Sequence, residues 1–405
     1  MTASRSAIRP LLASYGGGHA HIIATVGRAL LAADYDVNMI GFTTAYRALE
    51  RANLPVKSIE DLLIEDEDRQ YIDEIQKFLP SDTHPDVSDS ETEAYFALGF
   101  RDLCEGFGKA EAIERTKSLG RKAFEPVSSM ERYLRKTQPD VVITTTSPRF
   151  ELAMLKAARN LGIPSVAIGD WFLIQEREWI LNGEYAAHLC VLTESMVGQL
   201  LGEGLKGTRL HVTGNPAFDM LALQDGNMQR RIDLRKEMGA EGKTVILWPA
   251  AGSEAAMGGQ KFATPEEVVE VMEAVCRTNP EYFYVMRPHP NNPFEMPDAA
   301  MNGILSPAGL SAEDGLLMAD LVCVEVSTMG LQAALIGKPV ICVGFADYVN
   351  YPKYGLATAA DTLDEMAKIL IERSYSGPTD LDMPPLGTAT ENVVKVIESV
   401  LKQVV

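Results

Sequence analysis

Cysteine is scarce and scattered in this sequence. Five cysteines occur in 405 residues, and no two of them form a CxxC pair. Cys323 and Cys342 lie in apolar, strand-like runs, where a buried free thiol is the usual state of the residue. This usage suits a reducing compartment and gives no reason to expect a disulfide framework.

Long apolar runs are also missing. No run reaches the ~18–20 apolar residues that a membrane-spanning helix needs. Residues 1–15 lack the apolar core of a signal peptide. We therefore expect a cytoplasmic protein with no membrane span.

Basic residues are outnumbered. The chain has 37 Lys and Arg against 56 Asp and Glu, which gives a net charge of -19. An acidic surface disfavours general attraction to nucleic acid or to an anionic bilayer, so no nucleic-acid partner is expected, although a local basic pocket is not excluded. With 46% hydrophobic residues, a chain of this length predicts two globular domains or one large one.

What is present is an alternation of strand-like and helix-like segments along most of the chain. Apolar strands such as "PDVVITTT" and "KPVICVGF" are separated by single amphipathic helices, which predicts parallel pairing with right-handed crossovers. The fold class is therefore α/β, with two doubly wound, Rossmann-like parallel sheets in succession. We place the first domain at 1–220 and the second at 221–385.

Residues 60–125 interrupt this alternation. The segment is charged and helix-leaning, which predicts a helical insertion in the first domain. It is interpreted either as a solvated cover or as a mobile flap over a cleft.

The loop "ASYGGGHAHII" follows the first strand and opens the first helix. Gly17 and Gly18 permit close approach of a ligand to the main chain and are candidate phosphate-binding residues. His19 lies at the helix start, where the helix dipole is expected to lower its pKa and keep the ring neutral, as a general base requires. A tight turn with no ligand is the alternative.

Two loops of the second half carry further candidates for binding a nucleotide. "MRPHPNNP" ends a strand in Arg287 and His289, both good phosphate ligands, between prolines that stiffen the turn. "WPAAGSEAAMGG" is a small-residue loop in which Gly252 and Ser253 leave backbone groups accessible to a diphosphate. Rigid or flexible loops without a ligand are the alternatives.

The stretch "CVEVSTMGLQAALIGK" places a strand directly before a helix. Ser327 is either a simple helix cap or, with Thr328, a donor to a phosphate at the helix start. Gln332 lies about one turn into the helix, near a sugar bound there. Glu325 is a candidate hydrogen-bond acceptor for a ribose.

The loop "GDWFLIQERE" follows a strand of the first domain. Asp170 is the candidate carboxylate of this loop, and Glu176 is a second one. Trp171, Phe172 and Trp179 are interpreted either as stacking groups for a sugar or as a buried aromatic patch.

Taken together, "GGGH", "LHVTGNPAFDML", "RPHP" and "STMGLQAALIGKPVICVG" resemble the two-domain glycosyltransferases of the GT-B fold. The last two motifs look like those of capsule-polysaccharide and teichoic-acid-type transferases. Non-hydrolysing sugar-nucleotide 2-epimerases are related. The resemblance covers about residues 8–345.

The resemblance implies two domains facing a cleft, with a final helix at 386–405 that crosses back to the first domain. It implies a nucleotide-sugar donor on the second domain, at Arg287, His289, Ser327 and Thr328. His19 or Asp170 would then deprotonate an acceptor. The acceptor is an unknown small molecule, glycan or lipid-linked molecule. No metal is expected, and a homo-oligomer is compatible with the sequence.

Three functions stay open at this stage. A glycosyltransferase for polysaccharide biosynthesis is favoured. A 2-epimerase is the alternative, although "WPAAGSEAAMGG" lacks the histidine-arginine loop of those enzymes. A non-catalytic nucleotide-binding homologue is the third. The base, the sugar and the stereochemical outcome are not readable from the residues.

Overall fold

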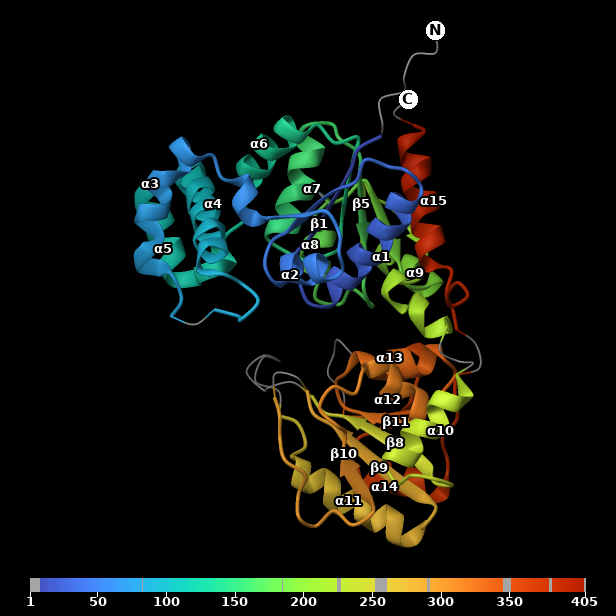
Figure 1. Cartoon of the computed structure of the whole chain (residues 1–405). Coiled ribbons are helices and arrows are strands. Elements are labelled where there is room, and N and C mark those ends of the chain that lie inside the picture. The colour runs from blue at the N-terminus through green and yellow to red at the C-terminus, as the bar shows by residue number, and fades with distance from the viewer. Residues whose placement is uncertain are drawn as a thin grey trace. The chain divides into compact units, whose positions relative to one another are not determined.

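The chain forms two compact units, seen in a computed structural model (Figure 1). The structure describes residues 8–403 apart from residues 82 and 184 and the segments 224–226, 252–260, 290–291, 345–350 and 379–380. Unit 1 comprises Met1–Asp219 and Asp382–Val405, and unit 2 comprises Met220–Leu381. The chain therefore leaves unit 1 once and returns to it.

Unit 1 is built on a seven-stranded sheet with the order β3-β2-β1-β4-β5-β6-β7, in which every pairing is parallel. The strands are β1 Pro10–Ser14, β2 Asn38–Gly41, β3 Val56–Ser58, β4 Val141–Thr144, β5 Ser165–Ile168, β6 His188–Val191 and β7 Arg209–Val212. The order reverses between β1 and β4, and the carboxyl ends of these strands at such a switch point are where open parallel sheets bind ligands.

Helices cover both faces of this sheet. The helices of unit 1 are α1 Gly18–Ala32, α2 Thr44–Arg51, α3 Glu65–Ile75, α4 Asp89–Phe107, α5 Lys109–Leu119, α6 Val127–Thr137, α7 Phe150–Asn160, α8 Arg177–Ile180, α9 Glu194–Gly202 and α15 Ala389–Leu401. Because side chains alternate along a strand, Leu12 of β1 packs with α1, α2 and α15, whereas Leu11 and Ala13 pack with α4, α6 and α7 on the opposite face.

The last helix is tied to unit 1 at its first turn. Asp219 accepts hydrogen bonds from the backbone N–H groups of Ala389 and Thr390, at 3.0 and 2.7 Å, and from the Thr390 hydroxyl. A carboxylate at this position also complements the helix dipole. Val393, Ile397 and Val400 of α15 are buried in the cluster that contains α1.

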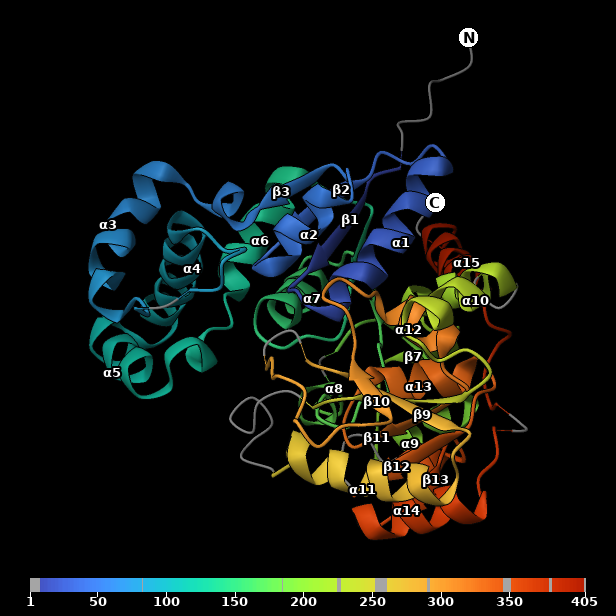
Figure 2. The same cartoon turned by 60° about the horizontal axis from the view of Figure 1, so that its bottom comes forward.

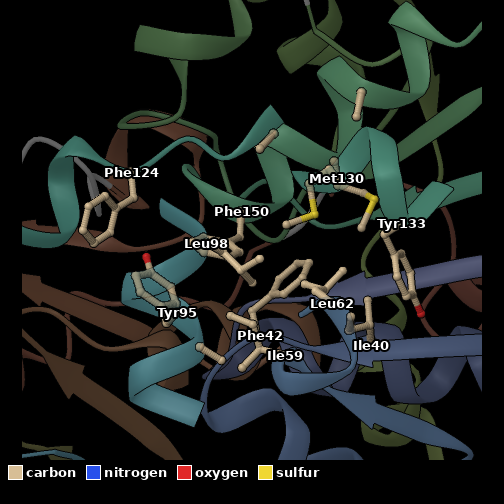
Figure 3. Packing of buried hydrophobic residues seen from close by; sticks show 14 of the residues in the cluster. Ile40, Phe42, Ile59, Leu62, Tyr95, Leu98, Phe124, Met130, Tyr133 and Phe150 are labelled. Atoms are coloured by element: carbon tan, nitrogen blue, oxygen red, sulfur yellow. The ribbon is translucent and has the colours of Figure 1, made fainter. Parts of the chain in front are cut away.

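The insertion predicted at 60–125 is helical, and Figure 1 shows α3, α4 and α5 grouped beside the sheet of unit 1. It is not only a solvated cover, because α4 buries Tyr95, Phe96, Leu98 and Phe100 in the core of the unit. Figure 3 shows Tyr95 beside Phe124, and the ring centroids of the two are 6.1 Å apart; the ring of Tyr95 also stacks on that of Phe150 at 4.2 Å.

Substitutions of two glycines of α4 are expected to change the stability of the fold in opposite directions. A methyl group at Gly99 would overlap the ring of Phe124, whereas a methyl group at Gly106 would meet no atom. We expect Gly99→Ala to lower the free energy of unfolding by about 1–3 kcal/mol through overpacking. The control Gly106→Ala should raise it by about 0.5–1 kcal/mol because it removes backbone freedom in a helix. Urea unfolding of both variants checks this, and equal effects would contradict the packing described.

Unit 2 is built on a six-stranded parallel sheet with the order β10-β9-β8-β11-β12-β13. Its strands are β8 Thr244–Pro249, β9 Tyr282–Arg287, β10 Gly303–Leu305, β11 Leu321–Val324, β12 Val340–Val343 and β13 Thr358–Ala360. Its helices are α10 Met228–Glu237, α11 Pro265–Thr278, α12 Ala312–Met318, α13 Thr328–Leu335 and α14 Leu363–Glu372. The strand order reverses between β8 and β11.

Figures 1 and 2 show α11 and α14 side by side along one face of this sheet. They bury Val268, Met272 and Leu370 against Ile246 and Tyr284 of the strands. The fold class predicted from the sequence, two doubly wound parallel-sheet domains, is confirmed. Short elements such as β10, β13, α10 and α12 are not among those that the sequence patterns predicted.

Within the part of the chain that the structure describes, no helix combines the length and the apolarity needed to cross a bilayer.

Candidate functional site

The first candidate site lies at the switch point of unit 1, where β1 and β4 end. Gly17 precedes α1 with a φ of 59°, in the left-handed region that favours glycine, and no atom approaches the position of a Cβ at Gly17 or Gly18. The glycines therefore turn the chain sharply and leave the start of α1 open. His19, at the second position of α1, projects toward the loops that follow β4 and β5.

The structure brings His19 and Asp170 together. The Nε2 atom of His19 is 3.2 Å from Asp170 Oδ2, and the two side chains are 17% and 20% exposed. Asp170 is held in place through Oδ1, which accepts the backbone N–H of Trp171 at 2.7 Å. The two residues named from separate loops therefore form one ion-pairing dyad that reaches the surface of unit 1.

The other ring nitrogen of His19 contacts hydroxyl groups of the loop after β4. Nδ1 is 2.5 Å from Thr145 Oγ1 and 3.0 Å from Ser147 Oγ. The Thr145 hydroxyl donates its own proton to Glu151 Oε2 at 2.6 Å, so its oxygen is left to accept the Nδ1–H of His19. Both ring nitrogens thus act as donors, which is the arrangement of an imidazolium.

This charge state corrects the prediction that the helix start keeps His19 neutral. Burial does lower its pKa, but the hydrogen bond and charge of Asp170, together with the charges of Glu151 and Glu176, outweigh burial and raise the pKa to about 9. His19 is therefore protonated at neutral pH and cannot act as a general base in that state. The prediction rested on the dipole of one helix, and it did not place Asp170, Glu176 or Glu151 against His19.

Two further carboxylates surround the dyad. Glu151, at the second position of α7, is fully buried and accepts the backbone N–H of Tyr15 at 2.5 Å. Burial raises the pKa of Glu151. Burial and the nearby charge of Asp170 also raise the pKa of Glu176. The site therefore holds several carboxylates whose environments differ, which is a common feature of acid–base centres.

The pKa of His19 predicts a pH dependence of stability. A folded-state value of about 9 against an ordinary value of 6.5 means that protonated His19 stabilises the fold fully below pH 6.5. This contribution, about 3 kcal/mol at most, is lost as the pH rises through 9. The difference in unfolding free energy between wild type and His19→Gln should therefore shrink from pH 6 to pH 9.5 in urea titrations.

The matched control for that titration is His21→Gln, because His21 is exposed on the same helix. A difference between wild type and His19→Gln that stays constant over this pH range would contradict the ion pair.

The aromatic residues beside Asp170 divide between the two interpretations of the sequence. Phe172 is fully buried, as the aromatic-patch interpretation expects. Trp179 donates its indole N–H to the backbone oxygen of Thr146 at 3.1 Å, which ties α8 to the loop after β4. Trp171 and Trp179 are half-exposed.

The second candidate site lies in unit 2, where β9 ends and α13 begins. Arg287 points at the first turn of α13: its guanidinium is 3.7 Å from Met329 Sδ and 3.5 Å from the Leu310 carbonyl oxygen. Burial lowers the pKa of Arg287. Among the described residues it has no carboxylate partner within ion-pair distance. No described side chain therefore forms an ion pair with this guanidinium, although the charge of Glu313 acts on it.

His289 follows Arg287 by two residues, and burial together with the charge of Arg287 lowers the pKa of its imidazole. Ser327 is the N-cap of α13, and its hydroxyl accepts the Met329 N–H at 3.3 Å, as the capping interpretation predicted. Thr328 is the first residue of the helix. Gln332 Oε1 is buried, with no hydrogen-bond partner among the described residues.

A cavity of about 190 Å³ adjoins the switch point of unit 2. Glu325, Trp248, Phe262 and Phe294 are among its lining residues. Glu325 accepts the backbone N–H of Ala263 at 3.0 Å, and burial raises its pKa to about 7. The predicted residues Gly252 and Ser253 lie outside the described residues.

The sequence reasoning missed Thr145, Ser147 and Glu151. Their signal is the run "TTTSPRFE" directly after β4, which places hydroxyl groups and a carboxylate at the edge where His19 lies. Within the described ranges, no cluster of three or more His, Cys, Asp or Glu side chains has the arrangement of a metal site.

Comparisons with known proteins agree with this fold. No protein-family model matches the chain. A lipid-A-disaccharide synthase of Gluconobacter oxydans is 31% identical over 147 residues, which is 36% of this chain and 33% of that enzyme. The chain thus matches about a third of the length of this curated relative.

Solved structures match over nearly the whole chain. The UDP-GlcNAc 2-epimerase of Neisseria meningitidis has a TM-score of 0.63 and 13% identity, over 97% of this chain and 100% of that one. A putative UDP-N-acetylglucosamine 2-epimerase of Listeria monocytogenes has a TM-score of 0.63 and 14% identity, over 98% of both chains. At these identities the likeness shows the fold alone, and the two-domain α/β fold that the resemblance implied is confirmed.

Proposed function

We propose that this protein is a glycosyltransferase that moves a sugar from a nucleotide-activated donor to an acceptor hydroxyl. The observation that carries the proposal is the His19–Asp170 dyad at the switch point of unit 1, where a carboxylate 20% exposed is held 3.2 Å from an imidazolium. A positioned carboxylate of this kind can accept the proton of a hydroxyl group as that group reacts.

In the proposed reaction, the acceptor oxygen bonds to the anomeric carbon of the sugar. The bond from that carbon to the donor phosphate breaks, and its electron pair leaves with the nucleotide. The proton of the acceptor passes to Asp170. His19 keeps its own proton and is a positioning residue, because both of its ring nitrogens already donate.

Unit 2 supplies the donor site in this proposal. Arg287, His289 and the start of α13 bind the phosphates and offset the charge that develops on the leaving group without a metal ion. Glu325 and the aromatic rings of its cavity accommodate one ring of the nucleoside, the ribose. The nucleotide named for the Neisseria meningitidis structure is UDP-GlcNAc, so uridine nucleotides are the first to test.

A thermal-shift screen of nucleotides and nucleotide sugars tests the donor. A bound ligand stabilises the fold by mass action, and 100-fold excess over Kd contributes about 2.7 kcal/mol. We expect one nucleotide sugar and its nucleotide to raise Tm. No shift with any uridine, cytidine, guanosine or adenosine compound would contradict the proposal.

A 2-epimerase is the second candidate, favoured by the carboxylates Asp170, Glu151 and Glu176 around His19. Epimerisation at C2 requires that a proton leave and return at that carbon, with no acceptor present. Incubation of the stabilising nucleotide sugar in heavy water separates the two functions. Deuterium at C2 would establish the epimerase, whereas a sugar that stays undeuterated and is consumed only with an acceptor supports the transferase.

A further inference from the structure

A pocket of unit 1 lies between the loop after β1, the loop after β2 and the inserted helix α4. Its volume is about 250 Å³. Tyr15, Phe42, Tyr95 and Phe96 contribute aromatic rings to its lining. The last three are at most 4% exposed, so they form a fixed apolar floor.

The other polar side chains of the lining are those of Thr43, Thr44, Thr83, His84, Glu91, Thr92 and Arg121. Glu91 is only 2% exposed. Only one of its two carboxylate oxygens accepts hydrogen bonds from described residues. Oε2 accepts the backbone N–H of Ser88 at 2.8 Å and its hydroxyl at 2.9 Å, which caps α4. Oε1 is buried and has no hydrogen-bond partner among the described residues.

An unpaired buried carboxylate oxygen is costly, because it has lost its water and gained no donor. A ligand that brings a hydroxyl group to Glu91 Oε1 removes this cost. The pocket also presents the guanidinium of Arg121, a donor, and the hydroxyl of Thr44, which already accepts the Gly17 N–H at 3.3 Å. A ligand with several hydroxyl groups can use donors and acceptors of this mixed kind.

The size of the pocket limits its occupant to one ring, and the charges of its lining favour a neutral one. A volume of about 250 Å³ lies below the ~300–1,000 Å³ of sites for drug-sized ligands, so it fits one ring and not a whole nucleotide. The negative charge of the Glu91 carboxylate is opposed by the positive charge of the Arg121 guanidinium, so the lining favours an uncharged ligand. A polyhydroxylated ring that places its C–H face on the aromatic floor satisfies every one of these features.

We propose that this pocket binds a single uncharged sugar ring, the terminal sugar of the acceptor. The assignment of the ring to an acceptor rests on the proposed transferase function, but the binding site itself does not. Glu91 accepts a sugar hydroxyl and Phe96 packs against the ring. The inserted helices 60–125 would then select the acceptor.

The test is binding of methyl glycosides of glucose, galactose, mannose and N-acetylglucosamine to the full chain, measured by saturation-transfer NMR and calorimetry. We expect at least one glycoside to bind. Glu91→Gln should weaken that glycoside at least tenfold, since a hydrogen bond to a charged group contributes about 1.5–3 kcal/mol. Glutamine keeps the cap of α4 through its amide oxygen but turns a donor toward the pocket.

The matched control is Asp89→Asn, an exposed carboxylate on the first turn of the same helix, which should change affinity less than twofold. Phe96→Leu, which keeps an apolar side chain, should weaken binding three- to tenfold and serves if Glu91→Gln fails to fold. The proposed sugar site would be contradicted if the glycosides bound no better than glycerol. It would also be contradicted if they bound equally to wild type and Glu91→Gln.

Nucleotide binding is measured in the same samples. Glycoside binding without any nucleotide response supports the sugar pocket and contradicts the transferase. Nucleotide binding without glycoside binding supports the proposed donor site and contradicts the proposed sugar site.

Discussion

Asp170→Asn is expected to lower kcat for sugar transfer by a factor of about 10²–10⁴, the usual contribution of a positioned proton acceptor. Asparagine keeps the size of the side chain and its bond to the Trp171 N–H, but it cannot take the proton of the acceptor. KM for the donor should change little, because Asp170 lies in unit 1 and the proposed donor residues lie in unit 2. Steady-state kinetics with the donor found by thermal shift check this.

The control is Glu178→Gln, an exposed carboxylate on α8 in the same part of the chain. It should leave kcat within about twofold of wild type. If the Asp170→Asn variant is as active as this control, Asp170 does not accept the proton of the acceptor.

The pH profile separates the role of Asp170 from that of His19. In wild type, kcat should fall above pH 9, where His19 loses its proton and the ion pair with Asp170 is lost. His19→Gln should lower kcat and remove this alkaline limb, because glutamine has no proton to lose. A rate that instead rises up to pH 9 would show that neutral His19 is the base, as the sequence alone had predicted.

Arg287→Ala is expected to produce the second large effect, a loss of about 10²–10³ in kcat/KM for the donor. The guanidinium has no carboxylate partner among the described residues, so its charge is available to a phosphate, and partial burial strengthens that interaction. Binding of the free nucleotide, measured by calorimetry, should weaken as well. Arg287→Lys should recover part of the loss, since lysine keeps the charge without the bidentate geometry.

Arg277→Ala is the matched control, because Arg277 is exposed near the end of α11. It should bind nucleotide as wild type does. If Arg287→Ala also binds nucleotide normally and turns over at the wild-type rate, the donor site is not at the end of β9.

Much of the fold could be predicted from the sequence, because buried strands of a parallel sheet are short apolar runs and the helices between them have apolar faces. β4, β5, β11 and β12 are of this kind, and all of their residues are buried. β10 was not predicted because its three residues are only half-buried and too few to form an apolar run. α10 was not predicted because seven of the ten residues of "MQRRIDLRKE" are polar and only Leu234 is buried.

The candidate site could be predicted only in part. His19 and Asp170 were each found from a loop after a strand, yet their 3.2 Å contact depends on the order of β1, β4 and β5 in the sheet. The charge of His19 depends on Glu151, whose neighbours in sequence are apolar helix residues. Glu91 carried no sequence signal beyond a helix cap, because its unpaired oxygen is a property of the packed insertion.

The capping of α15 by Asp219 has a consequence for the order in which the chain folds. The ribosome completes residues 220–381 before it reaches 389–401, and domains generally fold as units during synthesis. Unit 2 therefore has its full sequence available first, while α1 still exposes the surface that Val393, Ile397 and Val400 later cover. Unit 1 is completed only when the returning helix docks, and that docking follows the synthesis of the whole of unit 2.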